Sequence, residues 1–253
     1  MAKTRSLREN RLFQADGRAL VVAMDHARRA GQVTGLVRAN EIIETVVGAG
    51  ADAVLLPHGS AAAATAVVGN AGVWLSVDTT PAIASVTVEN ALRLGVDGIK
   101  IEIYPYSSDR ETLVNLLAMA GECGKWGLPL MVEAVPFGWA GADKRTTETI
   151  TASCRIASDG GADYVKAFYT GDTDSFRTLI DNCSVPVLVL GGPKTDSDRD
   201  VLTMVRDAMD AGAVGITMGR NIWGHDNVAG MTRALAAIIH DDASVDAAYR
   251  HLC

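Results

Sequence analysis

The chain has 253 residues, 48% hydrophobic and 21% charged, which is enough to bury the core of a single α/β barrel. Its formal net charge of −7 argues against nucleic acid as the main partner, because a phosphate backbone requires a concentrated basic face. No apolar run approaches the length of about 20 residues that a membrane span needs.

The first residues carry basic side chains but no hydrophobic segment of the signal-peptide type, so we expect a solvated N-terminal arm over residues 1–17. The basic residues of this arm are Lys3, Arg5, Arg8 and Arg11. Four scattered cysteines without C-x-x-C spacing favour reduced thiols over a disulfide framework or a zinc site. They are Cys123, Cys154, Cys183 and Cys253. These features predict a cytoplasmic protein.

Short apolar runs alternate along the chain with stretches that have apolar residues at helical spacing. The first run ends in Asp25, and a helical stretch from Arg38 to Val47 ends in glycines before the next run. The same order of helix end, glycine turn and strand recurs three more times, near residues 94–101, 160–166 and 211–218. The expected strands lie near residues 20–25, 53–57, 73–77, 98–104, 130–134, 163–167, 187–190 and 214–218.

Eight short strands alternating with helices predict a (β/α)8 TIM barrel. An open, doubly wound sheet is the second choice. No Gly-x-Gly-x-x-Gly follows the first strand, where a dinucleotide-binding sheet carries that motif. No linker or low-complexity segment divides the chain, so we expect a single domain over residues 1–253.

Alternation along the strands separates the residues that face the helices from those that face the barrel interior. In the fourth strand three isoleucines, at positions 99, 101 and 103, form the helix-facing set. The same alternation places a group of polar side chains inside the barrel, near the carboxyl ends of the strands. This group comprises Asp25, Lys100, Glu102, Tyr104, Glu133 and Lys166, the last sharing its face with Tyr164.

Lys166 stands at the end of an otherwise apolar strand, where an ammonium group is costly unless it is paired or neutral. A desolvated lysine with a lowered pKa is the nucleophile of Schiff-base chemistry. Barrel enzymes build their sites at the carboxyl ends of the strands, so we expect a catalytic lysine here. The alternative is a structural network of ion pairs that fills the barrel.

Glycines follow the last two expected strands. Gly191 and Gly192 come after the seventh strand, and Gly219 and Arg220 come after the eighth, before a short helical turn. Bare backbone N–H groups in this pair of loops form the usual phosphate site of the fold, and an arginine adds a bidentate contact. A pair of ordinary turns is the alternative.

With these residues the chain resembles the class I aldolase superfamily that includes archaeal-type fructose-bisphosphate aldolases, aminodeoxyheptulosonate synthases and the autoinducer-2 phosphate thiolase. The similarity is densest at residues 23–26, 164–172, 191–194 and 218–223. It implies that Lys166 forms the Schiff base and that Asp25 lies in the active site. It also implies that the loops at Gly191-Gly192 and Gly219-Arg220 hold a substrate phosphate.

The chain departs from the archaeal-type aldolases on the fifth strand. Those enzymes carry a catalytic tyrosine in a Tyr-Pro-Arg-Gly setting, where this chain has Val135-Pro-Phe-Gly138. Lys100 and Glu133 instead resemble the lysine and glutamate of the tagatose-bisphosphate and sulfofructose-phosphate aldolases. We therefore expect aldol cleavage of a ketose 1-phosphate into dihydroxyacetone phosphate and an aldehyde, with Glu133 as first candidate for proton transfer and Tyr104 and Asp25 behind it.

Other functions remain open from the residues alone. A related thiolase, an aldol or transaldol synthase, and a non-catalytic sugar-phosphate binder are the alternatives. His26 and His58 follow the first two strands, but no third ligand has a plausible metal-site spacing, so we expect neither a metal nor a cofactor. Lys144 and Arg145 are candidates to bind a second anionic group of the substrate. Trp139 and Trp223 are candidates to line the pocket mouth. The apolar outer helix at residues 228–239 suggests self-association into a homo-oligomer.

Overall fold

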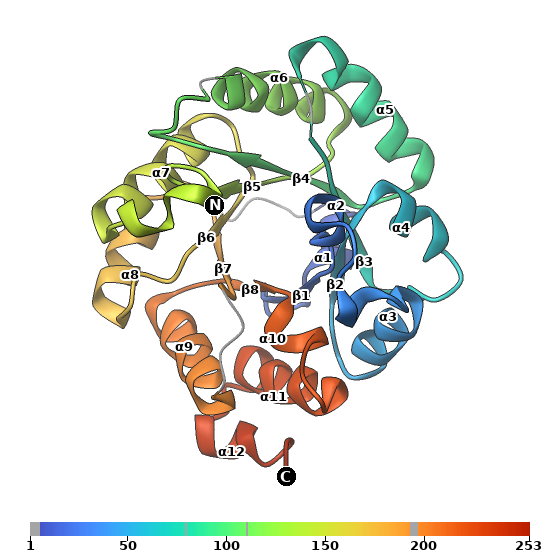
Figure 1. Cartoon of the computed structure of the whole chain (residues 1–253), viewed down its shortest axis with the longest axis vertical. Coiled ribbons are helices and arrows are strands. Elements are labelled where there is room, and N and C mark those ends of the chain that lie inside the picture. Colours follow the sequence, from blue (N-terminus) through green and yellow to red (C-terminus); the bar gives the residue numbers. More distant parts are fainter. Residues whose placement is uncertain (1–5, 79, 110, 193–196) are drawn as a thin grey trace.

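The computed structural model describes residues 6–78, 80–109, 111–192 and 197–253. Over these residues eight parallel strands close into a barrel in the order β1 to β8, surrounded by helices (Figure 1). The predicted (β/α)8 barrel is confirmed, and the open sheet is wrong. The strands are β1 (Ala19–Ala23), β2 (Ala53–Pro57), β3 (Gly72–Ser76), β4 (Gly98–Ile103), β5 (Leu130–Ala134), β6 (Tyr164–Ala167), β7 (Val187–Leu190) and β8 (Gly215–Met218).

The helices form the outer layer and the caps of the barrel, and several begin at side chains that accept a hydrogen bond from the first turn, among them Thr146 and Asp172. The longer helices are α3 (Ala39–Gly48), α4 (His58–Ala63), α5 (Ala84–Leu94), α6 (Glu111–Trp126), α7 (Thr147–Asp159), α8 (Thr173–Asp181), α9 (Asp198–Ala211) and α11 (Val228–His240). The shorter ones are α1 (Glu9–Leu12), α2 (Ala27–Ala30), α10 (Arg220–Trp223) and α12 (Val245–Tyr249), with 3-10 turns η1 (Thr34–Leu36), η2 (Pro81–Ile83) and η3 (Trp139–Lys144).

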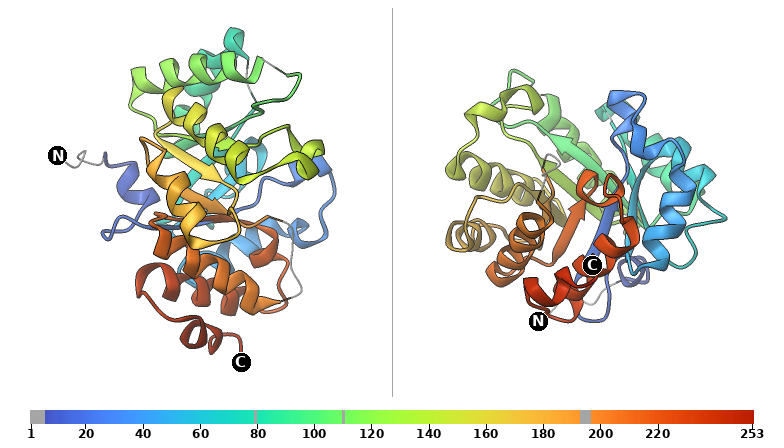
Figure 2. Two further views of the ribbon diagram at one scale, coloured as in Figure 1. Left: turned by 90° about the vertical axis from the view of Figure 1, so that its left-hand side faces the viewer. Right: turned by 60° about the horizontal axis from the view of Figure 1, so that its bottom comes forward.

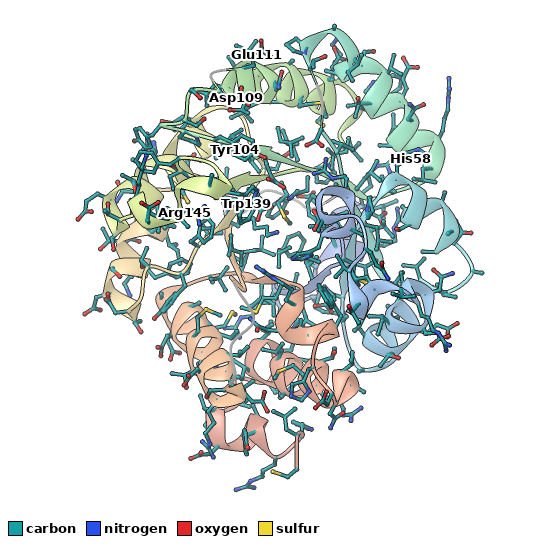
Figure 3. The ribbon with its side chains drawn as sticks, viewed as in Figure 1. His58, Tyr104, Asp109, Glu111, Trp139 and Arg145 are labelled. Atoms are coloured by element: carbon teal, nitrogen blue, oxygen red, sulfur yellow. The ribbon has the colours of Figure 1, made fainter. Side chains whose placement is uncertain are left out.

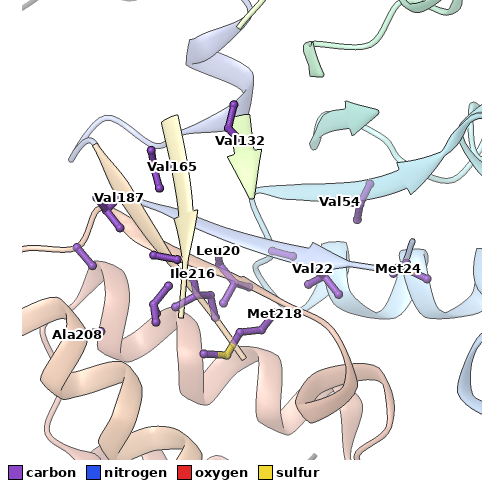
Figure 4. Close-up of a cluster of buried hydrophobic side chains, with 14 of the residues drawn as sticks. Leu20, Val22, Met24, Val54, Val132, Val165, Val187, Ala208, Ile216 and Met218 are labelled. Atoms are coloured by element: carbon purple, nitrogen blue, oxygen red, sulfur yellow. The ribbon is translucent and has the colours of Figure 1, made fainter. Parts of the chain in front are cut away.

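Two apolar layers follow from the alternation of strand side chains. The outward-facing side chains, such as Val22, Val132 and Val165, pack against the helices (Figure 4). The inward-facing side chains, such as Val21 and Leu188, fill the barrel interior toward the amino-terminal ends of the strands, together with Trp74 and Tyr164. The polar residues toward the carboxyl ends of the strands therefore stand above a filled apolar floor, and the predicted alternation is confirmed.

The segment before β1 closes the amino-terminal end of the barrel. Leu12 and Phe13 are buried there, and the Phe13 ring stacks on that of Tyr164 with centroids 4.6 Å apart. Figure 2 shows α1 at the barrel end opposite α2. The Arg8 guanidinium donates to the Val96 carbonyl at 3.0 Å, and that of Arg11 donates to Asp97 at 2.6 Å. The expected solvated arm is therefore wrong for this segment, whereas the two basic residues at positions 3 and 5 lie outside the described residues.

His240, the last residue of α11, lies between two carboxylates at the same end of the barrel. Its Nδ1 is 2.8 Å from an Asp16 oxygen, and its Nε2 is 2.9 Å from an Asp52 oxygen. Burial opposes a charge on this imidazole, but hydrogen bonds and attraction from both carboxylates prevail and raise the pKa of His240 to about 9. The base of the barrel is thus held by a charged histidine.

The apolar residues of α11 are part of the core. Met231, Leu235, Ile238 and Ile239 are all buried. The expectation that they form a self-association surface is wrong, because the apolar face of this helix packs on the barrel and its neighbours. The homo-oligomer stays a prediction. None of the helices in the described ranges is both long and apolar enough to cross a membrane.

Candidate active site

Strand register brings three of the predicted site residues into one row. Glu102 on β4 is opposite Glu133 on β5, and Glu133 is opposite Lys166 on β6. Neighbouring residues in register point to the same side of a parallel sheet, so all three side chains enter the barrel at the same level. Glu133 and Lys166 are 3% and 5% exposed, so this row lies inside the molecule.

Lys100 lies at the centre of the polar group and contacts three carboxylates. Its Nζ is 2.5 Å from Glu133 Oε2, 2.7 Å from Glu102 Oε1 and 3.1 Å from Asp25 Oδ2. Burial alone lowers the pKa of a lysine, but the three carboxylates outweigh burial and raise the pKa of Lys100 well above its usual value. Lys100 is therefore a fixed ammonium group that holds the three acids in place.

Glu133 bridges the two lysines. Its Oε2 contacts Lys100, and its Oε1 is 3.0 Å from Lys166 Nζ. A carboxylate in this position can take a proton from the neighbouring ammonium and return it without moving far. Of the predicted acids, Glu133 is thus the one placed directly beside the candidate nucleophile.

Asp25 is held as an anion beside the same cluster. The Ser76 hydroxyl donates to Asp25 Oδ2 at 2.6 Å, a contact that the sequence did not indicate. Burial raises the pKa of a carboxyl group, but the ammonium groups of Lys100 and Lys166 prevail and hold the pKa of Asp25 well below its usual range. Asp25 is therefore ionised across the neutral pH range.

Two further side chains donate to Glu102, one from the end of β4 and one from the loop after β5. The Tyr104 hydroxyl lies 2.9 Å from Glu102 Oε2, and the Trp139 Nε1 lies 2.8 Å from the same oxygen (Figure 3). Tyr104 faces inward as predicted, yet it is not among the residues that line the cavity described below. Tyr104 thus reaches the site through Glu102, whereas Trp139 forms part of the wall.

The loop after β5 positions Trp139 through an unusual turn. Phe137 and Gly138 both have positive φ, 61° and 70°. The Arg145 guanidinium donates to the Gly138 carbonyl at 2.7 Å and lies 4.4 Å above the Phe168 ring. Arg145 therefore braces the loop instead of lining the cavity, and Lys144 is exposed. The structure does not support the expectation that these two residues meet a second anionic group of the substrate.

Two adjoining hollows lie at this end of the barrel. The larger, here called the main cavity, has a volume of about 420 Å³. It is lined by Asp25, His26, Arg28, Ala30, Lys100, Glu102, Glu133, Trp139, Lys166 and Arg220. The smaller, here called the glycine pocket, shares His26, Glu133, Trp139, Lys166 and Arg220 with it and adds Ala23, Leu190, Gly191, Gly192, Thr217 and Gly219. Lys166 stands where the two hollows meet.

The glycine pocket is shaped by close backbone approach. A Cβ atom on Gly219 would lie 2.4 Å from the Ala23 carbonyl oxygen, so that position admits only glycine. The Arg220 guanidinium donates to the Gly192 carbonyl at 2.8 Å, and the Asn221 amide donates to the Gly191 carbonyl at 2.9 Å. The structure brings the four predicted phosphate-binding residues together, while Pro193 and Lys194 of the same motif lie outside the described residues.

Two further residues line the cavity: His26, which the sequence offered only as a possible metal ligand, and Arg28, which it did not single out. The His26 ring meets Trp223 edge-on, with centroids 5.4 Å apart, and burial lowers the pKa of this histidine. Both residues follow β1 in a loop without a recognisable motif. The position of His26 directly after Asp25 was the available signal, because it places the ring at the carboxyl end of a barrel strand.

His58 lies away from this cluster. It lines a separate hollow with Arg28 and Asp78 and stands on the α4 side of the barrel (Figure 3). Within the described ranges, His, Cys, Asp and Glu side chains form no group of three that is placed to hold a metal ion. The geometry therefore gives no support to a shared ligand role for His26 and His58.

A closed barrel with a buried lysine on β6, an adjacent glutamate and glycine loops after β7 and β8 defines a class I aldolase. The sequence comparison agrees with this assignment. The chain belongs to the DeoC/LacD family of aldolases, whose family model matches residues 19–225.

Relatives of known name align with nearly the whole chain. A 2-amino-3,7-dideoxy-D-threo-hept-6-ulosonate synthase of Halobacterium salinarum is 35% identical, over 96% of this chain and 94% of that protein. A class 1 fructose-bisphosphate aldolase of Thermoproteus tenax is 30% identical, over 91% and 92%. The structure of an archaeal fructose-1,6-bisphosphate aldolase, with its catalytic lysine covalently bound to the carbinolamine intermediate, superposes with a TM-score of 0.80 at 27% identity, over 92% and 98%.

Proposed function

We propose that this protein cleaves or forms a ketose 1-phosphate through an imine at Lys166, with dihydroxyacetone phosphate as the ketone half. One observation carries the proposal: Lys166 Nζ lies 3.0 Å from Glu133 Oε1 at the junction of the main cavity and the glycine pocket. A nucleophile with an adjacent base, next to a pocket for an anion, is what imine formation with a phosphorylated ketone requires.

Imine formation begins when Glu133 takes a proton from the Lys166 ammonium. The neutral amine then attacks the C2 carbonyl carbon, and Glu133 returns the proton to the carbinolamine oxygen. In total, two protons leave the lysine nitrogen with the former carbonyl oxygen as water. The product is a protonated imine whose positive nitrogen still faces the Glu133 carboxylate.

Cleavage of the C3–C4 bond needs a base for the C4 hydroxyl. Glu133 has regained its carboxylate form at this stage and accepts that proton, while the bond electrons flow into the imine to give an enamine. The aldehyde leaves, Glu133 returns the proton to C3, and water hydrolyses the resulting imine. Tyr104 is a weaker candidate because it contacts Glu102 and lies outside the cavity lining.

The glycine pocket would take the C1 phosphate. Gly191, Gly192 and Gly219 leave their backbone exposed to an anion, and Arg220 is the cation at the boundary of both hollows. A relative from Streptomyces griseus is named 2-amino-4,5-dihydroxy-6-oxo-7-(phosphonooxy)heptanoate synthase, a name that places a phosphate beside a ketone in the same way. It is 29% identical over 96% of this chain and 93% of its own length. Relatives named as synthases also support the bond-forming direction.

Borohydride trapping tests the proposal. Reduction in the presence of dihydroxyacetone phosphate should add the mass of the reduced ligand at Lys166. Lys166→Ala should lose this adduct and reduce turnover by roughly a thousandfold or more. Lys144→Ala is the matched control, because Lys144 is an exposed lysine in the loop after β5.

Full turnover by Lys166→Ala, or an adduct at another lysine, would contradict the assignment. Release of dihydroxyacetone phosphate from a panel of ketose phosphates, measured beside acyl transfer to coenzyme A, separates the aldolase from a thiolase.

A further inference from the structure

The two hollows assign different places to the two halves of the substrate proposed above. A phosphate in the glycine pocket and a ketone carbon bonded to Lys166 leave the aldehyde half only the rest of the main cavity. That region, here called the far wall, consists of the lining residues that the glycine pocket does not share. They are Asp25, Arg28, Ala30, Lys100 and Glu102.

Glu102 gives the far wall a fixed negative charge. Its Oε1 is 2.7 Å from Lys100, and its Oε2 accepts hydrogen bonds from Tyr104 and Trp139 at 2.9 and 2.8 Å. Its side chain is 5% exposed. Three donors hold the carboxylate in one position, so it cannot turn away from a group that enters the cavity.

Both cations of the far wall contact acids. Lys100 serves three carboxylates. Arg28 forms an ion pair with Asp78, and its Nη2 lies 3.9 Å from Glu102 Oε1. An anion that reached Arg28 would compete with Asp78 for the guanidinium group and would lie close to Glu102.

Arg220 lies at the glycine pocket, where the C1 phosphate would balance its charge, and the remaining charged side chains around the far wall have a negative balance. Asp25, Asp78, Glu102 and Glu133 stand against Lys100, Lys166 and Arg28. In the imine the Lys166 nitrogen is bonded to the ketone carbon and faces Glu133, and Arg145 is turned onto its own loop. A second phosphate on the aldehyde half would meet this excess of carboxylates at close range inside the protein, where repulsion is poorly screened. Hydroxyl groups, by contrast, can donate to carboxylates and accept from a guanidinium.

We infer that the aldehyde half of the substrate is an uncharged hydroxyaldehyde, and that Glu102 and the paired Arg28 exclude a second phosphate from the far wall. The inference rests on the proposed function and specifies its substrate class. The protein then uses ketose monophosphates and discriminates against ketose bisphosphates.

Matched aldehydes test this inference. Condensation with dihydroxyacetone phosphate is measured for D-glyceraldehyde against D-glyceraldehyde 3-phosphate, and for D-erythrose against D-erythrose 4-phosphate. We expect kcat/KM for the uncharged member of a pair to exceed that for the phosphorylated member at least tenfold. Asp78→Asn, which releases Arg28, should reduce this ratio severalfold, and Glu102→Gln should reduce it further. Asp174→Asn, at an exposed position of α8, is the matched control and should leave the ratio unchanged.

Three results would overturn the inference: equal or better use of the phosphorylated aldehydes by the wild type, a ratio unaffected by both variants, or no condensation with either uncharged aldehyde. Asp78→Asn keeps the test decisive if Glu102→Gln fails to fold, because Asp78 is 71% exposed. Borohydride trapping with dihydroxyacetone phosphate alone is run in parallel. Loss of trapping refutes the proposed function, whereas trapping with a preference for phosphorylated aldehydes refutes this inference alone.

Discussion

Replacing Lys100 by methionine removes the central cation of the site while keeping the length of an unbranched side chain. Lys100 is 1% exposed and contacts three carboxylates within 3.1 Å. Removing one partner of a buried ion pair typically costs about 3–5 kcal/mol, because it leaves uncompensated charge in the interior. In the variant, Lys166 would be the remaining lysine beside three buried acids. We therefore expect a cost in that range.

A loss of this size lowers the melting temperature of a chain this long by roughly 6–20 °C. The effect should also depend on pH. In the wild type the pKa of Asp25 is depressed, so its contribution is present above the unfolded pKa of about 4 and is lost at lower pH. Without Lys100 the crowded carboxylates gain protons in the folded state, and the deficit of the variant should shrink as the pH falls from about 8 to about 5.

Thermal unfolding of both proteins across that pH range provides the measurement. Lys125→Met is the matched control: Lys125 is 66% exposed and pairs only at the surface with Glu122, so the same substitution should cost well under about 1 kcal/mol. The reasoning is refuted if Lys100→Met melts within a degree or two of this control. It is also refuted if the deficit is the same at low and high pH.

Two further substitutions test other parts of the barrel. His240→Gln should destabilise the protein by about 1 kcal/mol near pH 6, after allowance for solvent screening. Because the folded pKa of His240 is raised to about 9, this difference should fade as the pH rises from about 6.5 through 9, and a deficit that persists above pH 9.5 in chemical denaturation contradicts the ion-pair account. Gly219→Ala forces a methyl group against the Ala23 carbonyl and should cost about 1–3 kcal/mol in stability and raise KM for a phosphorylated substrate. Gly59→Ala has open space around it and should change neither, so equal effects of the two alanines would count against steric exclusion.

The fold and the row of charged side chains follow closely from local sequence pattern. Each expected strand matches an observed one within one or two residues, because parallel strands buried on both faces are nearly continuous apolar runs. A lysine or acid that interrupts such a run must face either the helices or the interior, and period-two alternation decides between them. Lys100, Glu133 and Lys166 were therefore predictable before any contact was known.

The parts of the site formed by loops were not predictable in this way. Trp139 reaches Glu102 because Phe137 adopts a positive φ. A phenylalanine rarely has this conformation, so the sequence did not predict the turn. Arg145 looked like a charge available to substrate, but its nearest acceptors are backbone carbonyls of its own loop. Long-range pairing of this kind depends on where a loop folds back, which no local period encodes.

Glu133 has a consequence for the energetics of the whole catalytic cycle. In the resting site its carboxylate faces a positive nitrogen on Lys166, and in the protonated imine it faces a positive nitrogen on the same side chain. The electric field around the reacting centre is therefore already set before substrate arrives, and little dipole rearrangement has to accompany the change from amine to imine. Folding assembles this field once, and the same field then acts in every turnover.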